Sequence, residues 1–173
     1  MKRILVIGCP GAGKSTFARG LRDRTGLPLC YLDRIWHKPD GTSLSHADFD
    51  ARLSEILCRD CWIIDGNYLR TLERRLDRCD TVFLLDYPPA VCLAGAASRI
   101  GAPREDMPWI EREFDPEFRR WIEEFPRNQL PQIYELLERK RKKLEIFVFH
   151  SREEADRFLS SCDMARRAGR IAP

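Results

Sequence analysis

The sequence lacks both a long apolar run and a large net charge. Its 173 residues include 30 lysines and arginines against 27 aspartates and glutamates, which gives a formal net charge of +3. This excess is too small to indicate nucleic-acid binding by itself. The apolar run after Arg3 stops at Cys9 and Pro10, so it is too short for the core of a secretory signal or for a membrane span. We therefore expect a cytoplasmic protein with no membrane contact.

The sequence also lacks the paired cysteine motifs of a disulfide framework or a zinc site. Its seven cysteines are an odd number and lie scattered through apolar segments. In a reducing compartment this pattern predicts free, mostly buried thiols. Cys58 and Cys61 form a lone C-x-x-C pair, but a zinc site would need two more ligands at matching spacing. The thiol interpretation is therefore favoured over a metal or redox site.

Short apolar runs alternate with helical patterns along the whole chain. The runs are rich in β-branched and aromatic residues and mostly lack polar alternation, as in strands buried on both faces of a parallel sheet. They cover residues 3–8, 27–33, 61–66, 81–87 and 145–151, and the helical patterns cover 13–24, 46–58, 68–76, 88–100, 130–143 and 151–160. Asp115 and Pro116 predict the start of one more helix. This order predicts a single α/β domain over residues 1–173 with a doubly wound sheet.

The most specific motif is the glycine-rich stretch over residues 8–16, which reads GCPGAGKST. Its spacing matches the phosphate-binding loop pattern, and it follows a predicted strand and opens a predicted helix, as that motif requires. Glycines let backbone N–H groups face a polyphosphate at the positive end of the helix. Lys14 can reach the outer phosphates, and the hydroxyl of Ser15 can ligate Mg²⁺. The residues predicted to hold the nucleotide here are Gly8, Pro10, Gly11, Ala12, Gly13, Lys14, Ser15 and Thr16.

Three predicted strands end at or beside an aspartate. Asp33, Asp65 and Asp86 each follow an apolar run, and open α/β sheets bind ligands at the carboxyl ends of their strands. Any of the three could hold Mg²⁺ through water, and the sequence does not say which lies closest to the ion. For Asp33 and Asp65 the functional interpretation is favoured over a strand-end turn. For Asp86, which precedes Tyr87 and two prolines, the turn interpretation is favoured.

The segment over residues 99–126 is rich in arginines that stand among glycine, proline and acidic residues. Phosphoryl transfer spreads negative charge over the transferred group, and mobile arginines that close over it stabilise that charge and exclude water. The segment is therefore predicted to be a lid. The competing interpretation is a solvated helix face with Glu/Arg pairs. For Arg119 and Arg120 the two interpretations are equally favoured, whereas for Arg112 a role in phosphoryl transfer is slightly favoured.

Taken together, these stretches resemble the adenylate-kinase-like nucleotide and small-molecule kinases over roughly residues 3–159. The resemblance rests on GCPGAGKST, YLDRIWHKP, CWIIDGNY, LLDYP and SRIGAPREDM. Within that group the chain is similar to the proteins called DNA topology modulation proteins. The resemblance implies a three-layer P-loop NTPase fold, in which a five-stranded parallel sheet of order 2-3-1-4-5 carries helices on both faces. It also implies a mobile lid between the fourth and fifth strands.

The resemblance also implies roles for residues around the acceptor. The IIDGNY stretch gives Asp65 the Mg²⁺-water role and places Gly66, Asn67 and Tyr68 near the acceptor, with Arg70 one position later than the family's acceptor arginine. Asp33 and Arg34 fall where shikimate- and gluconate-type kinases carry an acidic residue that meets the acceptor hydroxyl. Asp33 is then a candidate general base or orienting group. Trp36 follows in the region that covers the acceptor pocket, where it could stack on the substrate or pack in the core.

Two arginines are assigned by similarity to the lid entry of these kinases. Arg99 would flank the adenine of ATP, and Arg104, again one residue late, would contact the transferring phosphate. With Lys14 and Asp33 they make up the predicted catalytic set, and Arg112 is a further predicted substrate contact. The resulting hypothesis is a kinase that transfers a phosphoryl group from Mg-ATP to a small acceptor, either a nucleotide, a nucleoside or a hydroxylated metabolite.

The alternative hypothesis is a nucleotide-dependent DNA-binding regulatory protein. It rests on the basic run over residues 139–143 and on a basic tail over 163–173, which includes Arg166, Arg167 and Arg170. Basic runs bind phosphate backbones weakly and with strong salt dependence. The run also ends a predicted helix, where the dipole favours basic residues, and this interpretation is favoured. A third possibility, an ATPase switch without an acceptor, is disfavoured by the predicted substrate pocket. Whether the protein is a monomer or a dimer stays open.

Overall fold

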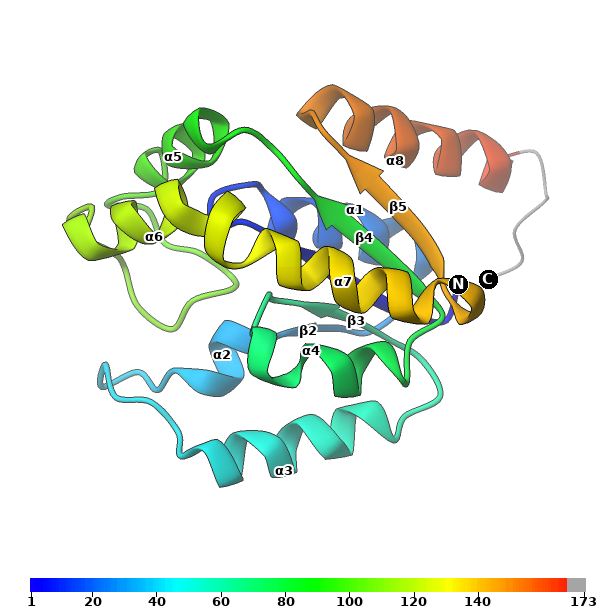
Figure 1. The fold of residues 1–173 in the computed structure, drawn as a ribbon, viewed down its shortest axis with the longest axis horizontal. Helices are drawn as coiled ribbons and strands as arrows, with labels where there is room; N and C mark the ends of the chain where they lie inside the picture. Colours follow the sequence, from blue (N-terminus) through cyan, green and yellow to red (C-terminus); the bar gives the residue numbers. More distant parts are fainter. Residues whose placement is uncertain (168–173) are drawn as a thin grey trace.

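A computed structural model describes residues 1–167, and the side chains of residues 1–162. Its centre is a five-stranded sheet in the order β2-β3-β1-β4-β5 (Figure 1). All neighbouring strands pair in parallel. The strands are β1 (Arg3–Gly8), β2 (Leu29–Tyr31), β3 (Trp62–Asp65), β4 (Thr81–Leu85) and β5 (Glu145–Phe149). The predicted parallel sheet and its strand order are confirmed.

Helices connect the strands and cover the sheet. They are α1 (Lys14–Thr25), α2 (Leu32–Trp36), α3 (His46–Leu57), α4 (Leu69–Leu76), α5 (Pro89–Ala97), α6 (Pro116–Asn128), α7 (Leu130–Lys140) and α8 (Arg152–Arg167), with a 3₁₀ turn at Arg141–Lys143. α1 and α8 contact each other on one side of the sheet, whereas α4 and α7 contact each other on the other side (Figure 1). Asp115 caps α6 by accepting a hydrogen bond from the backbone N–H of Glu117, as its pairing with Pro116 predicts.

The sheet is buried because its inner strands are apolar on both faces. Ile4, Leu5, Val6 and Ile7 of β1 are all fully buried. Beside them, Phe83 of β4 meets Phe17 of α1 with ring centroids 5.0 Å apart. This packing fixes the carboxyl edge of the sheet, where the loop after β1 and the last residue of β3 lie next to each other.

One predicted strand boundary is wrong in a way that matters for function. The run over 27–33 was expected to be a strand that ends at Asp33, but β2 ends at Tyr31 and Asp33 lies in the first turn of α2. Leu32 is fully buried, so the apolar pattern continues across the boundary and periodicity cannot separate the short strand from the helix. Asp33 therefore stands beyond the edge of the sheet rather than at it.

Two further expectations concern the cysteines and the basic tail. Within the described residues Cys9 and Cys92 are buried, Cys58 is exposed and the other four are intermediate, so the prediction of mostly buried thiols is wrong. Two of the intermediate ones lie outside the helices and strands, Cys61 just before β3 and Cys79 after α4. The tail over 163–173 lies outside the residues whose side chains are described. None of the described helices has the length and apolar character needed to cross a membrane.

Candidate functional site

The loop between β1 and α1 has the backbone conformation of a phosphate cradle. Gly11 and Gly13 have φ values of 81° and 89°, a region that residues with a Cβ rarely adopt. A Cβ on Gly11 would also lie 2.0 Å from the carbonyl oxygen of Cys92 in α5, so no larger residue fits there. Gly13 caps α1, and the loop therefore brings its backbone to the positive end of that helix, where anions bind.

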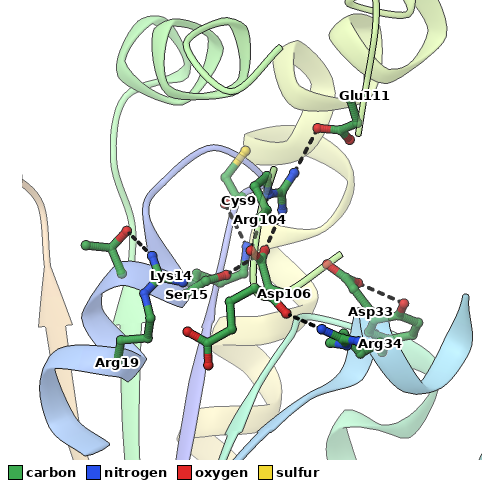
Figure 2. Close-up of polar contacts among 12 residues, drawn as sticks. Cys9, Lys14, Ser15, Arg19, Asp33, Arg34, Arg104, Asp106 and Glu111 are labelled. Atoms are coloured by element: carbon green, nitrogen blue, oxygen red, sulfur yellow. Dashed lines mark hydrogen bonds and ion pairs between the residues drawn. The ribbon is translucent and has the colours of Figure 1, made fainter. Parts of the chain in front are cut away.

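The two polar side chains that open α1 are both held within the protein. Lys14 Nζ donates a 3.1 Å hydrogen bond to the carbonyl of Cys9, which folds the lysine over its own loop. Ser15 Oγ donates a 3.0 Å hydrogen bond to Asp106 Oδ2, from the segment between α5 and α6 (Figure 2). Thr16 accepts a hydrogen bond from Arg19 at 3.1 Å. An acidic residue of the predicted lid thus contacts the hydroxyl predicted to ligate Mg²⁺.

Two cavities meet at this loop. The smaller has a volume of about 300 Å³ and is lined by Gly11, Gly13, Lys14, Ser15 and Thr16 together with Arg19, Arg99, Arg104 and Arg152. The larger has a volume of about 840 Å³ and extends from Pro10, Lys14 and Ser15 to Asp33, Trp36, Asp65, Gly66, Asn67, Tyr68 and Arg112. Lys14, Ser15 and Asp106 line both cavities. The smaller, arginine-lined cavity and the larger cavity thus meet at the N-terminal end of α1.

Asp65 is the last residue of β3 and is 5% exposed. Its Oδ1 has no hydrogen-bond partner among the described residues. Burial raises the pKa of this carboxyl to about 6, although Lys14 and Ser15 work to lower it. A buried, partly unpaired carboxylate beside a hydroxyl and a phosphate cradle is a suitable setting for Mg²⁺, which keeps water and phosphate ligands and needs few from the protein.

The described residues contain no cluster of three or more histidine, cysteine or acidic side chains that could hold a metal ion alone. Ser15 and Asp65, the two residues that the sequence predicts for Mg²⁺, both line the larger cavity.

Replacing Asp65 with asparagine is expected to stabilise the metal-free protein at neutral pH. The folded-state pKa of about 6 lies above the ordinary aspartate value of 3.8, so ionisation destabilises the folded state as pH rises through this window. The gain from Asp65→Asn should be small at pH 4 and reach the order of 3 kcal/mol above pH 7. Chemical denaturation of both proteins at the two pH values measures it.

The matched control for this experiment is Asp60→Asn, because Asp60 is exposed in the loop before β3. It should leave the free energy of unfolding unchanged at both pH values. An equal gain from Asp65→Asn at pH 4 and pH 7.5 would contradict the assigned pKa.

The acceptor end of the larger cavity is organised around Asp33 and Tyr68. Tyr68 Oη donates a 2.9 Å hydrogen bond to Asp33 Oδ1. Tyr68 has φ 31° and ψ 69°, a left-handed conformation that is costly for a bulky residue and is often found at functional sites. Its ring stacks on Phe49 at 5.2 Å, and Trp36 meets the same Phe49 edge-on at 5.5 Å. Trp36 therefore packs against the fold and lines the cavity at once.

Arg75 holds the loop that carries Asn67 and Tyr68, and the sequence analysis missed it. Its side chain is fully buried and donates to the carbonyl oxygens of Gly66 at 2.8 Å, of Asn67, and of Tyr68 at 2.9 Å. Burial lowers the pKa of Arg75 to about 9, so the guanidinium stays charged at neutral pH. Its position on the apolar face of α4, next to Leu72 and Leu76, is the signal that could have revealed it.

Replacing Arg75 with methionine is expected to lower the free energy of unfolding by about 3 kcal/mol or more, because buried carbonyl groups would lose their donors. Urea denaturation measures the loss. The neighbouring Arg74→Met is the control: Arg74 is exposed and donates a hydrogen bond to the hydroxyl of Ser54, so its replacement should change stability by no more than about 0.5 kcal/mol. Equal effects of the two substitutions would show that Arg75 has no special role.

The segment between α5 and α6 folds over the phosphate-binding loop. Arg104 contacts Asp106 and also pairs with Glu111 at 2.8 Å (Figure 2). Burial favours a higher pKa for Asp106, but Arg104 and the Ser15 hydrogen bond outweigh it and hold that pKa below its usual value. Asp106 is 5% exposed and was not among the predicted site residues. Arg99 lies nearby. Its pKa is lowered mainly by burial and next by the positive charge of Arg104.

Comparison with known proteins places this arrangement in a recognised fold. No family model matches the chain. The adenylate kinases of Thermotoga petrophila and Thermotoga maritima are each 31% identical to it over 97 residues, which is 54% of this chain and 43% of each kinase. The match therefore spans less than half the length of those relatives.

Two solved structures cover nearly the whole chain. A shikimate kinase from Acinetobacter baumannii in complex with shikimate superposes with a TM-score of 0.62 at 15% identity, covering 99% of this chain and 96% of that one. A gluconokinase from Sinorhizobium meliloti 1021 gives 0.55 at 18% identity, covering 97% and 94%. The chain has the adenylate-kinase-like P-loop kinase fold. In this P-loop kinase fold, the loop after β1 and the end of β3 meet at the ligand-binding edge of the sheet.

Not every predicted site residue of this P-loop kinase fold lines the cavities. Arg70 pairs with Asp50 of α3 at 2.6 Å and is turned to the surface, because its place one position late on α4 directs it toward α3. Arg34 is exposed and donates to the backbone of Glu105 at 3.0 Å. Neither lines either cavity formed by the described residues, so the structure does not bring Arg34 and Arg70 together with the other predicted acceptor residues.

Other predicted residues are buried within the loop or exposed on the lid. Gly8 is buried, and a Cβ on it would lie 2.4 Å from the carbonyl oxygen of Leu85; Ala12 is also buried. Arg119 and Arg120 are exposed on α6, and Arg119 pairs with Glu123 at 3.1 Å, as on a solvated helix face. The predicted lid thus includes one irregular stretch and most of a regular helix.

Asp86 and the basic run over 139–143 remain to be placed. Asp86 accepts a 2.7 Å hydrogen bond from Tyr134 Oη and does not line either cavity among the described residues, which fits its turn interpretation. In the run over 139–143, Lys140 Nζ lies 2.5 Å from Asp77 and Arg139 lies 3.6 Å from Glu73. Part of the charge of this run is therefore neutralised by α4, which favours the helix-end interpretation.

Proposed function

We propose that the protein transfers the γ-phosphoryl group of Mg-ATP to a hydroxyl group of a small acceptor. The observation that carries the proposal is that Lys14 of the phosphate-binding loop and Asp33 of α2 line one cavity. This arrangement places a phosphate-binding cation and a candidate proton acceptor in a single space. The larger cavity would take the acceptor and the smaller one, with its arginines, the nucleotide.

The chain's own residues supply positioning and charge. Backbone N–H groups of the loop and Lys14 would hold the outer phosphates, and Arg99 and Arg104 would stabilise the charge that develops on the transferred group. Asp33 would orient the acceptor hydroxyl and accept its proton, while the Tyr68 hydrogen bond fixes the carboxylate. Mg²⁺ held near Ser15 and Asp65 would neutralise phosphate charge. The segment between α5 and α6 would exclude water.

The lining of the larger cavity favours an acceptor with an apolar or planar body. Its wall includes the aromatic residues His37, Trp109, Phe114, Phe118 and Trp121. Of the arginines in this cavity, Arg104 is already paired with two carboxylates. A nucleoside or another ring-bearing alcohol therefore fits better than a highly charged sugar acid, because the aromatic wall can cover a ring but cannot neutralise several anionic groups.

A coupled assay of ADP release tests the proposal. Nucleosides, nucleoside monophosphates, ring-bearing alcohols and sugar acids are offered one class at a time with Mg-ATP. We expect one class of hydroxylated acceptor to raise turnover far above the rate with water alone. If no acceptor in any class does so while Mg-ATP binds, the protein is a nucleotide-binding protein rather than a kinase of small alcohols.

A further inference from the structure

We propose that Asp106 is a carboxylate of the divalent-cation site, contributed by the segment between α5 and α6 and acting with Ser15 and Asp65. The inference rests on the proposed function, since the ion would enter with the nucleotide. In this view the segment does more than cover the cleft: it completes the cation site when it is closed.

The first support is the contact between Asp106 and Ser15. Ser15 Oγ lies 3.0 Å from Asp106 Oδ2, and Ser15 is the hydroxyl of the phosphate-binding loop that would ligate the ion. Figure 2 shows the Asp106 carboxylate facing Ser15 on one side and Arg104 on the other. Asp106 lines both cavities, so its carboxylate is at the junction where nucleotide and acceptor would meet.

The second support is the buried carboxylate of Asp65. It is 5% exposed and its Oδ1 has no partner among the described residues. Asp65 and Asp106 are each 5% exposed and line the larger cavity together. A buried carboxylate is unfavourable unless hydrogen bonds or a cation compensate it. Arg104 compensates Asp106, but no described arginine or lysine pairs with Asp65 at salt-bridge distance.

The competing explanation is that Asp106 only holds Arg104 in place. Glu111 already binds Arg104 through a separate guanidinium nitrogen at 2.8 Å, so a single acidic partner would be enough for that purpose. The two explanations predict opposite results. If Asp106 is a cation ligand, its replacement weakens divalent-cation binding. If Asp106 only holds Arg104, its replacement releases Ser15 and Arg104 and strengthens the binding of Mg-nucleotide.

The test measures the binding of Mn²⁺ to the full chain by electron paramagnetic resonance. A non-hydrolysable ATP analogue is present, and no acceptor is added. Asp106→Asn is expected to weaken Mn²⁺ binding about tenfold or more, the usual size of a loss near a metal ligand. Glu117→Gln is the control, because Glu117 is exposed on α6 and lines neither cavity among the described residues. It should leave Mn²⁺ affinity unchanged.

Unchanged or tighter Mn²⁺ binding by Asp106→Asn overturns the inference but leaves the proposed function intact. Absence of Mn²⁺-nucleotide binding by the unaltered protein overturns both. A second measurement needs no variant: Fe²⁺ bound in place of Mg²⁺ with the nucleotide, in the presence of ascorbate and oxygen, cleaves the backbone close to the ion. Cleavage near residue 106 as well as near residue 15 supports the inference, and cleavage near residue 15 alone contradicts it.

Discussion

Replacing Lys14 with alanine is expected to lower the rate of phosphoryl transfer from Mg-ATP by about a thousandfold or more. Lys14 is the cation of the phosphate-binding loop and lines both cavities, so it would contact the transferred group on the way from donor to acceptor. Its loss removes a preorganised charge from a site where charge stabilisation supplies most of the catalysis. Steady-state kinetics with the acceptor from the screen measures the rate, and calorimetry measures Mg-ATP affinity.

Lys142→Ala is the control for this experiment, because Lys142 is exposed in the 3₁₀ turn after α7. It should leave both the rate and the Mg-ATP affinity unchanged. If Lys14→Ala binds Mg-ATP with unaltered affinity and keeps its activity, the assignment of residues 8–16 as the nucleotide site is wrong.

Replacing Asp33 with asparagine is expected to lower kcat by about 10²- to 10⁴-fold, the range for loss of a general base. Asparagine keeps the shape of the side chain and can still accept the Tyr68 hydrogen bond, but it cannot take a proton. Mg-ATP affinity should change less than twofold, because the phosphate-binding loop is untouched. Steady-state kinetics and calorimetry of the same preparations separate the two effects.

The control here is Asp156→Asn, an exposed position on α8, which should behave like the unaltered protein. Tyr68→Phe is an informative companion variant, because it removes only the orienting hydrogen bond and should cost less than Asp33→Asn. A loss of Mg-ATP affinity as large as the loss of kcat would show that Asp33 belongs to the nucleotide site instead of the acceptor site.

Local sequence patterns predict the sheet and the phosphate-binding loop well. The inner strands are apolar on both faces, so their parallel pairing follows from composition, and the glycine spacing specifies the loop after β1 together with Lys14 and Ser15. The order of the strands came from the resemblance to P-loop kinases. The boundary at Asp33 could not be read in the same way, because the buried Leu32 extends the apolar pattern of β2 into α2.

The residues that the sequence did not reveal depend on contacts between distant segments. Asp106 lies 91 positions from Ser15 in the chain, and nothing in the local pattern of the lid separates it from the exposed acidic residues around it. The position of Arg75 on the apolar face of α4 indicates burial, but its hydrogen bonds to the carbonyls of residues 66–68 are visible only in the structure. Arg70 illustrates the converse, since a shift of one position along α4 turns it toward Asp50.

Function and stability oppose each other at Asp65. Its carboxyl is buried with a pKa of about 6. The ionised carboxylate, which a bound cation would require, therefore destabilises the metal-free fold at neutral pH. Such trade-offs are common where a site must be ready for a charged ligand. Binding of a cation would compensate the buried charge, and the stability gained with Mg-ATP should exceed that gained with ATP alone.

The most direct measurement follows the γ-phosphoryl group itself. ATP labelled with ¹⁸O in its γ-phosphate is incubated with Mg²⁺, the protein and each acceptor class, and the products are analysed by mass spectrometry. Transfer through the cavity shared by Lys14 and Asp33 predicts that three labelled oxygens appear on a phosphorylated acceptor and that Lys14→Ala abolishes this product. Label that appears only in inorganic phosphate, whatever the acceptor, would contradict the account.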